Sequence, residues 1–122
     1  MCDCTLAMYT TISMCDCTPF IIHCLFLNRK MYLTLPVCYR VLLNQIFFLF
    51  QFSQNLHLEK QLIATHPRIM AECSPRDCLW GIGLGANNEK AWNKKTWRGK
   101  NLLGYALMEV RKHIMKAKGL IK

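Results

Sequence analysis

The segment from Lys100 to Gly119 constrains the fold most, because its apolar side chains recur at three- and four-residue spacing. That spacing places them on one stripe of an α-helix, and such a stripe is buried against other elements. Gly119 suits the stop after the helix. Gly104, one turn inside it, costs up to about 1 kcal/mol relative to alanine, which predicts that another backbone or a ligand approaches closely. The stripe consists of Leu103, Ala106, Leu107, Val110 and Ile114.

A shorter helix is predicted over residues 53–67, SQNLHLEKQLIATHP. Ser53 or Asn55 can cap its first turn, because a side-chain oxygen there accepts a hydrogen bond from an unpaired backbone N–H. Its end is predicted at His66, because the residue before a proline avoids the helical backbone conformation. Residues 68–73, RIMAEC, alternate in polarity and therefore predict a brief β-strand.

The apolar region before that helix has no clean period. Residues 31–43, MYLTLPVCYRVLL, fit a strand pair interrupted at Pro36, because proline breaks a β-ladder. Residues 41–52, VLLNQIFFLFQF, fit either a buried helix or a strand, since so short a run does not discriminate between them. The apolar runs fall short of the roughly 18–20 residues that a membrane helix needs, so we expect no stable membrane span.

Cysteine is concentrated in the first half of the chain, where residues 1–50 hold six of the eight. The pentapeptide MCDCT occurs at residues 1–5 and again at 14–18. Paired zinc ligands are usually separated by two or more residues, whereas one residue separates them here, so we expect a cysteine-containing leader without a metal. The N-terminus has no secretion-signal pattern, which predicts free thiols in a reducing compartment and a cytoplasmic location.

Length and charge fit one small domain with a basic C-terminal part. The chain has 122 residues and a formal net charge of +9, and residues 51–122 hold thirteen basic and five acidic residues. This excess suits nucleic acid, nucleotide phosphates or an acidic membrane surface, and it equally suits a solvated basic face. Trp92 and Trp97 lie among lysines and arginines, a composition that fits either stacking on a base or a loop pinned into the core.

A carboxylate pair stands out in residues 71–104, AECSPRDCLWGIGLGANNEKAWNKKTWRGKNLLG. Glu72 and Asp77 flank a Ser-Pro turn. A carboxylate in such a turn can stabilise positive charge on a sugar ring or orient a water molecule. Alternatively, Asp77 caps the segment that starts at Leu79, and Glu72 is solvated. The GIGLGA letters at residues 81–86 lack the preceding strand of a dinucleotide-binding loop, which argues against that function.

The order of these features resembles the C-terminal part of the NADAR domain family, the YbiA-like proteins. The resemblance runs from about Phe50 to Met115. It is carried by E-x-S-P-x-D-x-x-W-G-I-G at residues 72–83 and by W-R-G-K-N-L-L-G-x-A-L-M at residues 97–108. It implies a mainly helical α+β fold and N-glycosidase activity. Family members of known activity hydrolyse the ribose–amine bond of riboflavin intermediates or remove ADP-ribose from modified guanine.

The resemblance also implies the site residues. Asp77 becomes the candidate acidic catalytic residue, whose carboxylate stabilises an oxocarbenium-like transition state or positions water. The partner is expected to be a ribosyl phosphate or an ADP-ribose-like molecule, with nucleic acid as a weaker alternative, and no metal or cofactor is expected. The candidate substrate-binding residues are Glu72, Ser74, Trp80, Gly81, Gly83, Lys100 and Asn101.

Residues 1–49 do not match the family pattern, because they contain neither a Trp nor a Glu. We therefore predict two parts, an unassigned cysteine-rich and apolar segment at residues 1–49 and the C-terminal part of a NADAR domain at residues 50–122. Three functions remain open at this point. They are an active N-glycosidase, an inactive fragment that binds a nucleotide or ADP-ribose weakly, and an interaction protein that docks through apolar residues 19–52.

Overall fold

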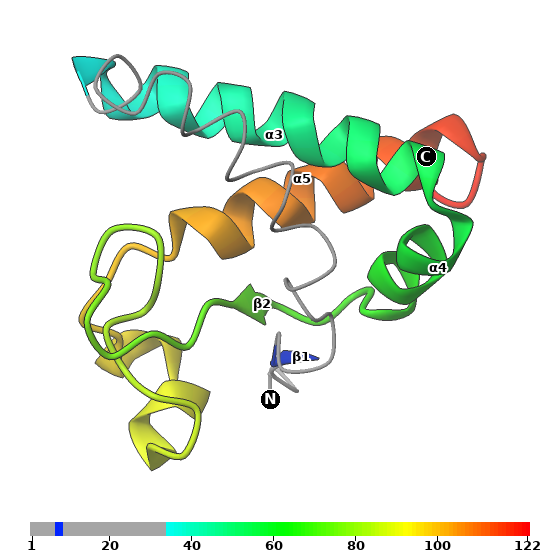
Figure 1. The fold of residues 1–122 in the computed structure, drawn as a ribbon. Helices are drawn as coiled ribbons and strands as arrows, with labels where there is room; N and C mark the ends of the chain where they lie inside the picture. The colour runs from blue at the N-terminus through cyan, green and yellow to red at the C-terminus, as the bar shows by residue number, and fades with distance from the viewer. Residues whose placement is uncertain (1–6, 9–33) are drawn as a thin grey trace.

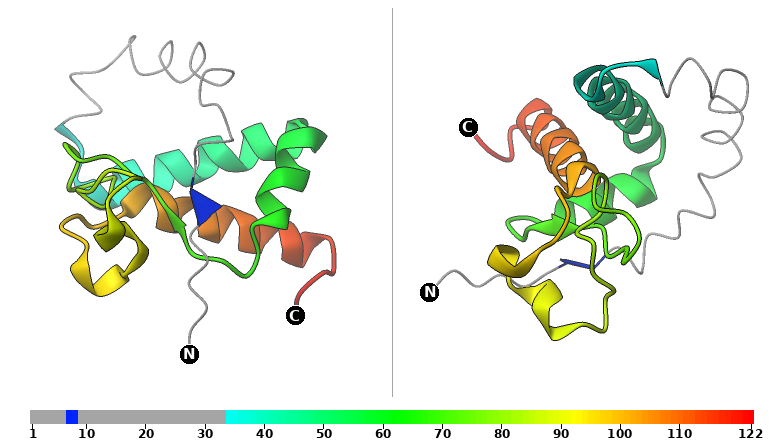
Figure 2. Two further views of the ribbon diagram at one scale, coloured as in Figure 1. Left: turned by 90° about the horizontal axis from the view of Figure 1, so that it is seen from below. Right: turned by 90° about the vertical axis from the view of Figure 1, so that its left-hand side faces the viewer.

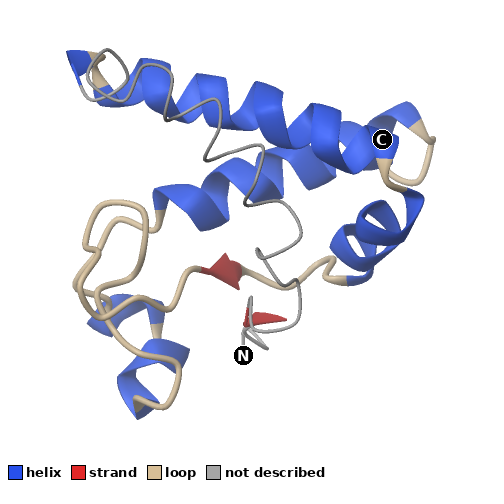
Figure 3. Ribbon diagram, viewed as in Figure 1, coloured by secondary structure: helices blue, strands red, loops and turns tan. Residues whose placement is uncertain are grey.

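The computed structural model describes residues 7–8 and 34–122, and these residues are mainly helical (Figures 1 and 3). The described strands are short and form a two-stranded parallel ladder, in which Ala7 pairs with Met70 and Met8 with Ala71. This arrangement confirms the predicted α+β, mainly helical class. In chain order the elements are β1 (Ala7–Met8), α3 (Val37–Gln54), α4 (Leu56–Ala64), β2 (Met70–Ala71), the 3-10 helices η2 (Glu89–Trp92) and η3 (Lys94–Thr96), and α5 (Leu102–Ala117).

Helices α3 and α5 lie side by side, and α4 and β2 pack against α5 (Figures 1 and 2). The predicted stripe of α5 faces this contact, and its members are buried except for Leu103, which is partly buried against the core. The prediction of a helix with this buried face is therefore confirmed. The main core cluster consists of Phe48, Phe52, Leu62, Met70, Leu107, Val110 and Ile114.

The strand pair predicted over residues 31–43 is wrong for the part that the structure describes, because α3 begins at Val37. Pro36 precedes the helix with φ −53°, and its carbonyl accepts hydrogen bonds from Tyr39 N at 3.0 Å and Arg40 N at 3.2 Å. A proline needs no amide partner at this position, so it starts a helix here instead of interrupting a ladder. Residues 41–52 belong to the same helix.

Asn55 separates α3 from α4 and caps the second helix, as the sequence predicts. Its Oδ1 accepts hydrogen bonds from His57 N at 3.2 Å and Leu58 N at 3.3 Å. Ser53, the alternative cap, instead donates its hydroxyl to Leu49 O at 2.6 Å within α3. The helix ends at Ala64, slightly before the predicted end at His66.

Strand β2 contains only Met70 and Ala71, and both side chains are buried. The predicted alternation is therefore not observed, because this short segment is enclosed by α5 and by the ladder with β1. The connection before it is fixed by Arg111 of α5, a side chain that is 6% exposed. Its Nη1 donates to Thr65 Oγ1 at 2.7 Å and to Arg68 O at 3.0 Å.

Gly104 lies where α5 crosses β2, and the predicted close approach of another backbone is confirmed. A Cβ atom at this position would overlap Met70 O and would lie 2.5 Å from Asn101 Nδ2. The helix and strand can therefore approach this closely only because residue 104 lacks a side chain.

We expect Gly104→Ala to destabilise the fold by about 1–3 kcal/mol, because overpacking outweighs the gain of about 1 kcal/mol in helix propensity. Urea denaturation followed by circular dichroism measures this change. Gly85→Ala is the matched control, since a Cβ at Gly85 would have no neighbour within 4 Å. A Gly104→Ala protein as stable as the unmodified one would contradict the predicted crowding.

Candidate functional site

The loop of residues 72–83, the carboxylate loop, follows β2 and lies beside the start of α5 (Figures 1 and 2). Backbone hydrogen bonds join it to the segment that leads into α5. Gly99 N donates to Ile82 O at 2.8 Å, and Lys100 N donates to Cys78 O at 2.8 Å. Asn101 N donates to Gly81 O at 3.1 Å. The two family-like sequence motifs are thus adjacent in space.

Asn101 connects α5 to the beginning of the carboxylate loop through its side chain. The residue is 0% exposed and has a left-handed backbone, with φ 53° and ψ 39°. Its Oδ1 accepts from Glu72 N at 3.0 Å, and its Nδ2 donates to Met70 O at 2.9 Å. Both polar ends of the amide are therefore used to fix the backbone on either side of Ala71.

The N-terminus of α5 also binds the loop. Leu102 N donates to Leu79 O at 3.2 Å, and Leu103 N donates to Trp80 O at 3.1 Å. These are among the amides at the start of a helix that lack partners within the helix and that can bind a phosphate when they are free. Here they position the carboxylate loop instead.

Asp77 caps the segment that starts at Leu79, which is one of the two roles that the sequence suggests for it. Its Oδ1 accepts hydrogen bonds from Leu79 N and from Trp80 N, each at 2.8 Å. No hydrogen bond within the described part of the chain reaches Oδ2. The carboxylate of Asp77 is therefore held to the loop backbone through Oδ1.

Glu72 is partly buried, which differs from the solvated side chain of the alternative interpretation. Burial raises the pKa of its carboxyl group, and the nearby Asp77 carboxylate raises that pKa further. The backbone of Glu72 is fixed as well, because its carbonyl accepts from Ser74 N at 3.1 Å and from Ile82 N at 2.9 Å. The loop therefore holds two interacting carboxylates in different environments.

The glycines of the loop are closely surrounded by other atoms of the loop and of the segment before α5. A Cβ at Gly81 would lie 2.9 Å from Asp77 O and 3.0 Å from Glu72 O. Gly83 has φ +70°, and a Cβ there would lie 2.9 Å from Cys78 Sγ. Both glycines are buried, so their observed role is to let the loop fold tightly, and their contact with a ligand stays a prediction.

The other predicted binding residues lie at the surface of the same region. Ser74 and Trp80 are partly exposed, and the Lys100 side chain is exposed. Trp97 donates its Nε1–H to Ala91 O at 2.8 Å, whereas Trp92 is 48% exposed. Trp97 packs against a second, smaller core cluster, which consists of Ala71, Ile82, Leu84 and Ala91. Trp97 therefore fits a loop that is anchored in the core, whereas Trp92 does not, and stacking on a base stays a prediction.

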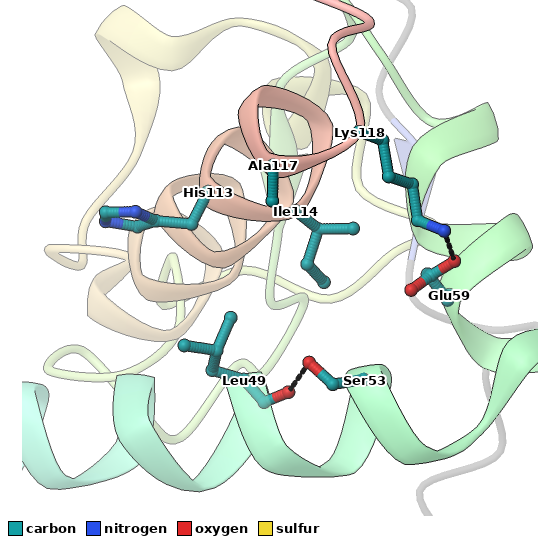
Figure 4. A pocket seen from close by; sticks show the side chains of 7 residues that line it. All are labelled: Leu49, Ser53, Glu59, His113, Ile114, Ala117 and Lys118. Atoms are coloured by element: carbon teal, nitrogen blue, oxygen red, sulfur yellow. Dashed lines mark hydrogen bonds and ion pairs between the residues drawn. The ribbon is translucent and has the colours of Figure 1, made fainter.

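A groove of about 380 Å³ lies elsewhere, between α3, α4 and α5, and shares no residue with the carboxylate loop (Figure 4). At one end of the groove, Lys118 forms an ion pair with Glu59, and the distance between Lys118 Nζ and Glu59 Oε1 is 2.8 Å. Sequence inspection did not find this groove, because its residues come from three separate helices and carry no local pattern. Its lining residues are Leu49, Ser53, Glu59, His113, Ile114, Ala117 and Lys118.

In residues 34–122, no three His, Cys, Asp or Glu side chains form a group that could hold a metal. Burial, and then the Glu72 carboxylate, raise the pKa of the Cys73 thiol, so that it stays protonated and is a poor nucleophile. The paired cysteines of residues 2–17 lie outside the described residues. None of the helices that the structure describes is long and apolar enough to span a bilayer.

Comparison with known families gives a match between residues 38–115 and the sequence model of the NADAR domain. The chain belongs to the NADAR domain family. The match includes every predicted site residue, and it confirms the resemblance seen in the sequence. It starts at Cys38, in the first turn of α3, which runs through residues 49 and 50 without a break. The predicted division of the chain at that point stays a prediction.

Two curated relatives resemble the NADAR part of the chain. An N-glycosidase of Acanthamoeba polyphaga mimivirus is 46% identical over 61 residues, which cover 50% of this chain and 36% of the relative. Protein irg-1 of Caenorhabditis elegans is 39% identical over 64 residues, which cover 52% of this chain and 30% of the relative. The chain thus matches about a third of the length of these relatives. No solved structure matches significantly.

We expect Asp77→Asn to lower the pKa of Glu72 without returning it to 4.5, because burial is the larger cause of the shift. Carbon-detected NMR titration of the Glu72 carboxyl measures this, and the asparagine retains an oxygen for the cap on Leu79 and Trp80. A pKa of Glu72 that does not respond to Asp77→Asn would contradict the coupling of the two carboxylates.

The same shift predicts how stability depends on pH. Because the folded-state pKa of Glu72 lies above its unfolded value, its contribution to stability is complete below about pH 4.5 and is lost as pH rises through the folded pKa. Glu72→Gln removes this loss, so we expect the variant to gain stability relative to the unmodified chain as pH rises through that window. Urea denaturation at several pH values provides the check.

Proposed function

We propose that the protein is an N-glycosidase that hydrolyses the C–N bond between ribose and an amine or base, with Glu72 and Asp77 as its catalytic carboxylates. The observation that carries this proposal is the pair of carboxylates on one clamped loop, where burial and Asp77 raise the pKa of Glu72. Two carboxyl groups with different environments are what general acid catalysis at a glycosidic bond requires. The name of the mimivirus relative is consistent with this activity.

In the proposed reaction Glu72 is the general acid. Its raised pKa lets it hold a proton closer to neutral pH and donate that proton to the leaving nitrogen. The C1′–N bond breaks with its electron pair on nitrogen, and positive charge develops on the ribose ring. Asp77 stabilises this charge through Oδ2, while Oδ1 stays bonded to the loop amides. Water then bonds to C1′ and returns a proton to Glu72.

The remaining residues divide into binding and positioning roles. Trp80 and Ser74 would contact the ribose, and the exposed ammonium group of Lys100 would pair with a phosphate. Gly81, Gly83 and the buried Asn101 would act through the backbone of the loop. We therefore propose a negatively charged ribosyl substrate, either a ribosyl phosphate of the riboflavin-intermediate type or an ADP-ribosyl compound, without a metal or cofactor.

A second candidate function is binding of the same ligand class without turnover. It is favoured by the coverage of the curated relatives, since the chain matches about a third of their length. A ribosyl ligand would then contact the carboxylate loop while other parts of a full-length relative complete the catalytic site. We place either function in the cytoplasm, which is consistent with free thiols at the described Cys38, Cys73 and Cys78.

Mass spectrometry of the purified chain with an aminouracil ribosyl phosphate, and separately with an ADP-ribosylated guanine nucleoside, tests the proposal. We expect release of the ribose product, slowed about 10²–10⁴-fold by Glu72→Gln or Asp77→Asn. The rate should fall as pH rises through the pKa of Glu72, because the acid loses its proton. Glu89→Gln, at an exposed carboxylate of η2, should leave the rate unchanged.

Release that persists unchanged in both Glu72→Gln and Asp77→Asn would contradict the assigned carboxylates. No release from the unmodified chain, together with calorimetric binding that Lys100→Gln weakens, would replace the N-glycosidase by the binding function. Neither turnover nor binding would exclude both functions for this chain.

A further inference from the structure

Helix α3 exposes a row of six large apolar side chains that begins beside its contact with α5, where Leu42, Ile46 and Leu49 border a groove, and continues to the side away from Phe48 and Phe52. At 100° per residue they fall within about a third of the helix circumference and form one continuous row, the α3 stripe. Each is between 37% and 62% exposed. The α3 stripe consists of Tyr39, Leu42, Leu43, Ile46, Leu49 and Phe50.

The α3 stripe makes the helix apolar on a second side, beyond the side that forms the core. One side packs on α5 and α4, as the core cluster shows. The other contains no charged residue and is too large and continuous to be an ordinary set of scattered surface residues. Apolar surface of this size and continuity marks an interaction site, which is the basis for assigning a partner to the α3 stripe.

We propose that the α3 stripe packs against the α3 stripe of a second copy of this chain, with the two helices antiparallel. Tyr39, Leu43, Ile46 and Phe50 are separated by four, three and four residues, which is the spacing of a two-helix seam. The order of residue types, aromatic, aliphatic, aliphatic and aromatic, is the same in both chain directions, and so is the spacing. An antiparallel pair thus places Tyr39 opposite Phe50 of the partner subunit, and Leu43 opposite Ile46 of the partner subunit.

This self-complementarity is what a two-fold symmetric interface requires, since each surface must fit a copy of itself. The centre of the seam is aliphatic and its two ends are aromatic. Opposed copies of the α3 stripe bring no like charges together, although the chain as a whole carries a net charge of +9. A second copy is therefore a suitable occupant of the stripe itself.

The exposed area of the α3 stripe is also large enough for an interface between two copies. Side chains of this size, exposed to the observed fractions, present about 600 Å² per copy, so a symmetric pair would bury about 1,200 Å², at the lower end for stable interfaces. A smaller groove of about 140 Å³ borders the α3 stripe, with Leu42, Ile46 and Leu49 on one wall and Val110 and His113 of α5 on the other. It offers a recess for a side chain of the partner subunit.

Sedimentation velocity of the full chain over a wide concentration range, with reductant present for its thiols, tests the proposal. We expect a dimer whose dissociation constant rises about a hundredfold in Leu43→Glu and in Ile46→Glu, because each places unpaired charges in an apolar seam. Leu56→Glu is the matched control. Leu56 is 66% exposed but lies on α4, outside the α3 stripe, so this variant should dimerise normally.

The orientation is tested by charge pairing across the two ends of the seam. Tyr39→Lys and Phe50→Glu should each weaken the dimer, whereas the double variant should recover it, because antiparallel helices bring the opposite charges together. A parallel pair would bring like charges together and would be weakened further by the double variant. Circular dichroism of each variant verifies that the helices remain folded.

An unmodified chain that is monomeric at every concentration would overturn the proposal, including the case in which another segment of the same chain covers the α3 stripe. Dimers that Leu43→Glu and Ile46→Glu leave unchanged would overturn it too. So would flotation of a monomer with phosphatidylcholine vesicles that Leu43→Glu abolishes, since that would make a lipid surface the occupant. The expected results do not depend on the N-glycosidase proposal.

Discussion

The side-chain amide of Asn101 is the interaction on which the rest of the site depends. It receives a hydrogen bond from Glu72 N and donates one to Met70 O, and the residue itself starts helix α5. A buried amide with both ends satisfied fixes its neighbours strongly, because breaking either bond would leave a polar group without a partner away from water. The left-handed backbone of Asn101 suits this role, since asparagine tolerates that conformation better than most residues.

The chemistry of the carboxylates follows from this clamp. With the start of α5 bonded to the loop carbonyls, the loop folds tightly over Gly81, and Glu72 becomes partly buried next to Asp77. Burial is the larger cause of the raised pKa of Glu72, and the nearby Asp77 carboxylate is the smaller one. Helix α5 fixes the backbone of the loop that carries the proposed catalytic acid.

The sequence predicted those features that depend only on residues close together in the chain. The period of the α5 stripe, the cap at Asn55 and the capping alternative for Asp77 all depend on residues within a few positions of one another. For residues 41–52 the sequence left helix and strand as alternatives, because α3 is apolar on two sides and so lacks the period that distinguishes a helix from a strand. The role of Asn101 was also missed, since its partners lie 29 and 31 residues away in sequence. Family resemblance had placed Asn101 among the substrate-binding residues, without its clamp on β2.

Amide hydrogen exchange at Glu72, measured residue by residue by NMR, tests the clamp most directly. The account predicts that this N–H, in a loop residue, exchanges as slowly as the amides of Leu102 and Leu103 at the start of α5, because all three open together. Exchange of the Glu72 amide as fast as that of an exposed loop amide, while α5 stays protected, would show that Asn101 does not hold the carboxylate loop to the helix.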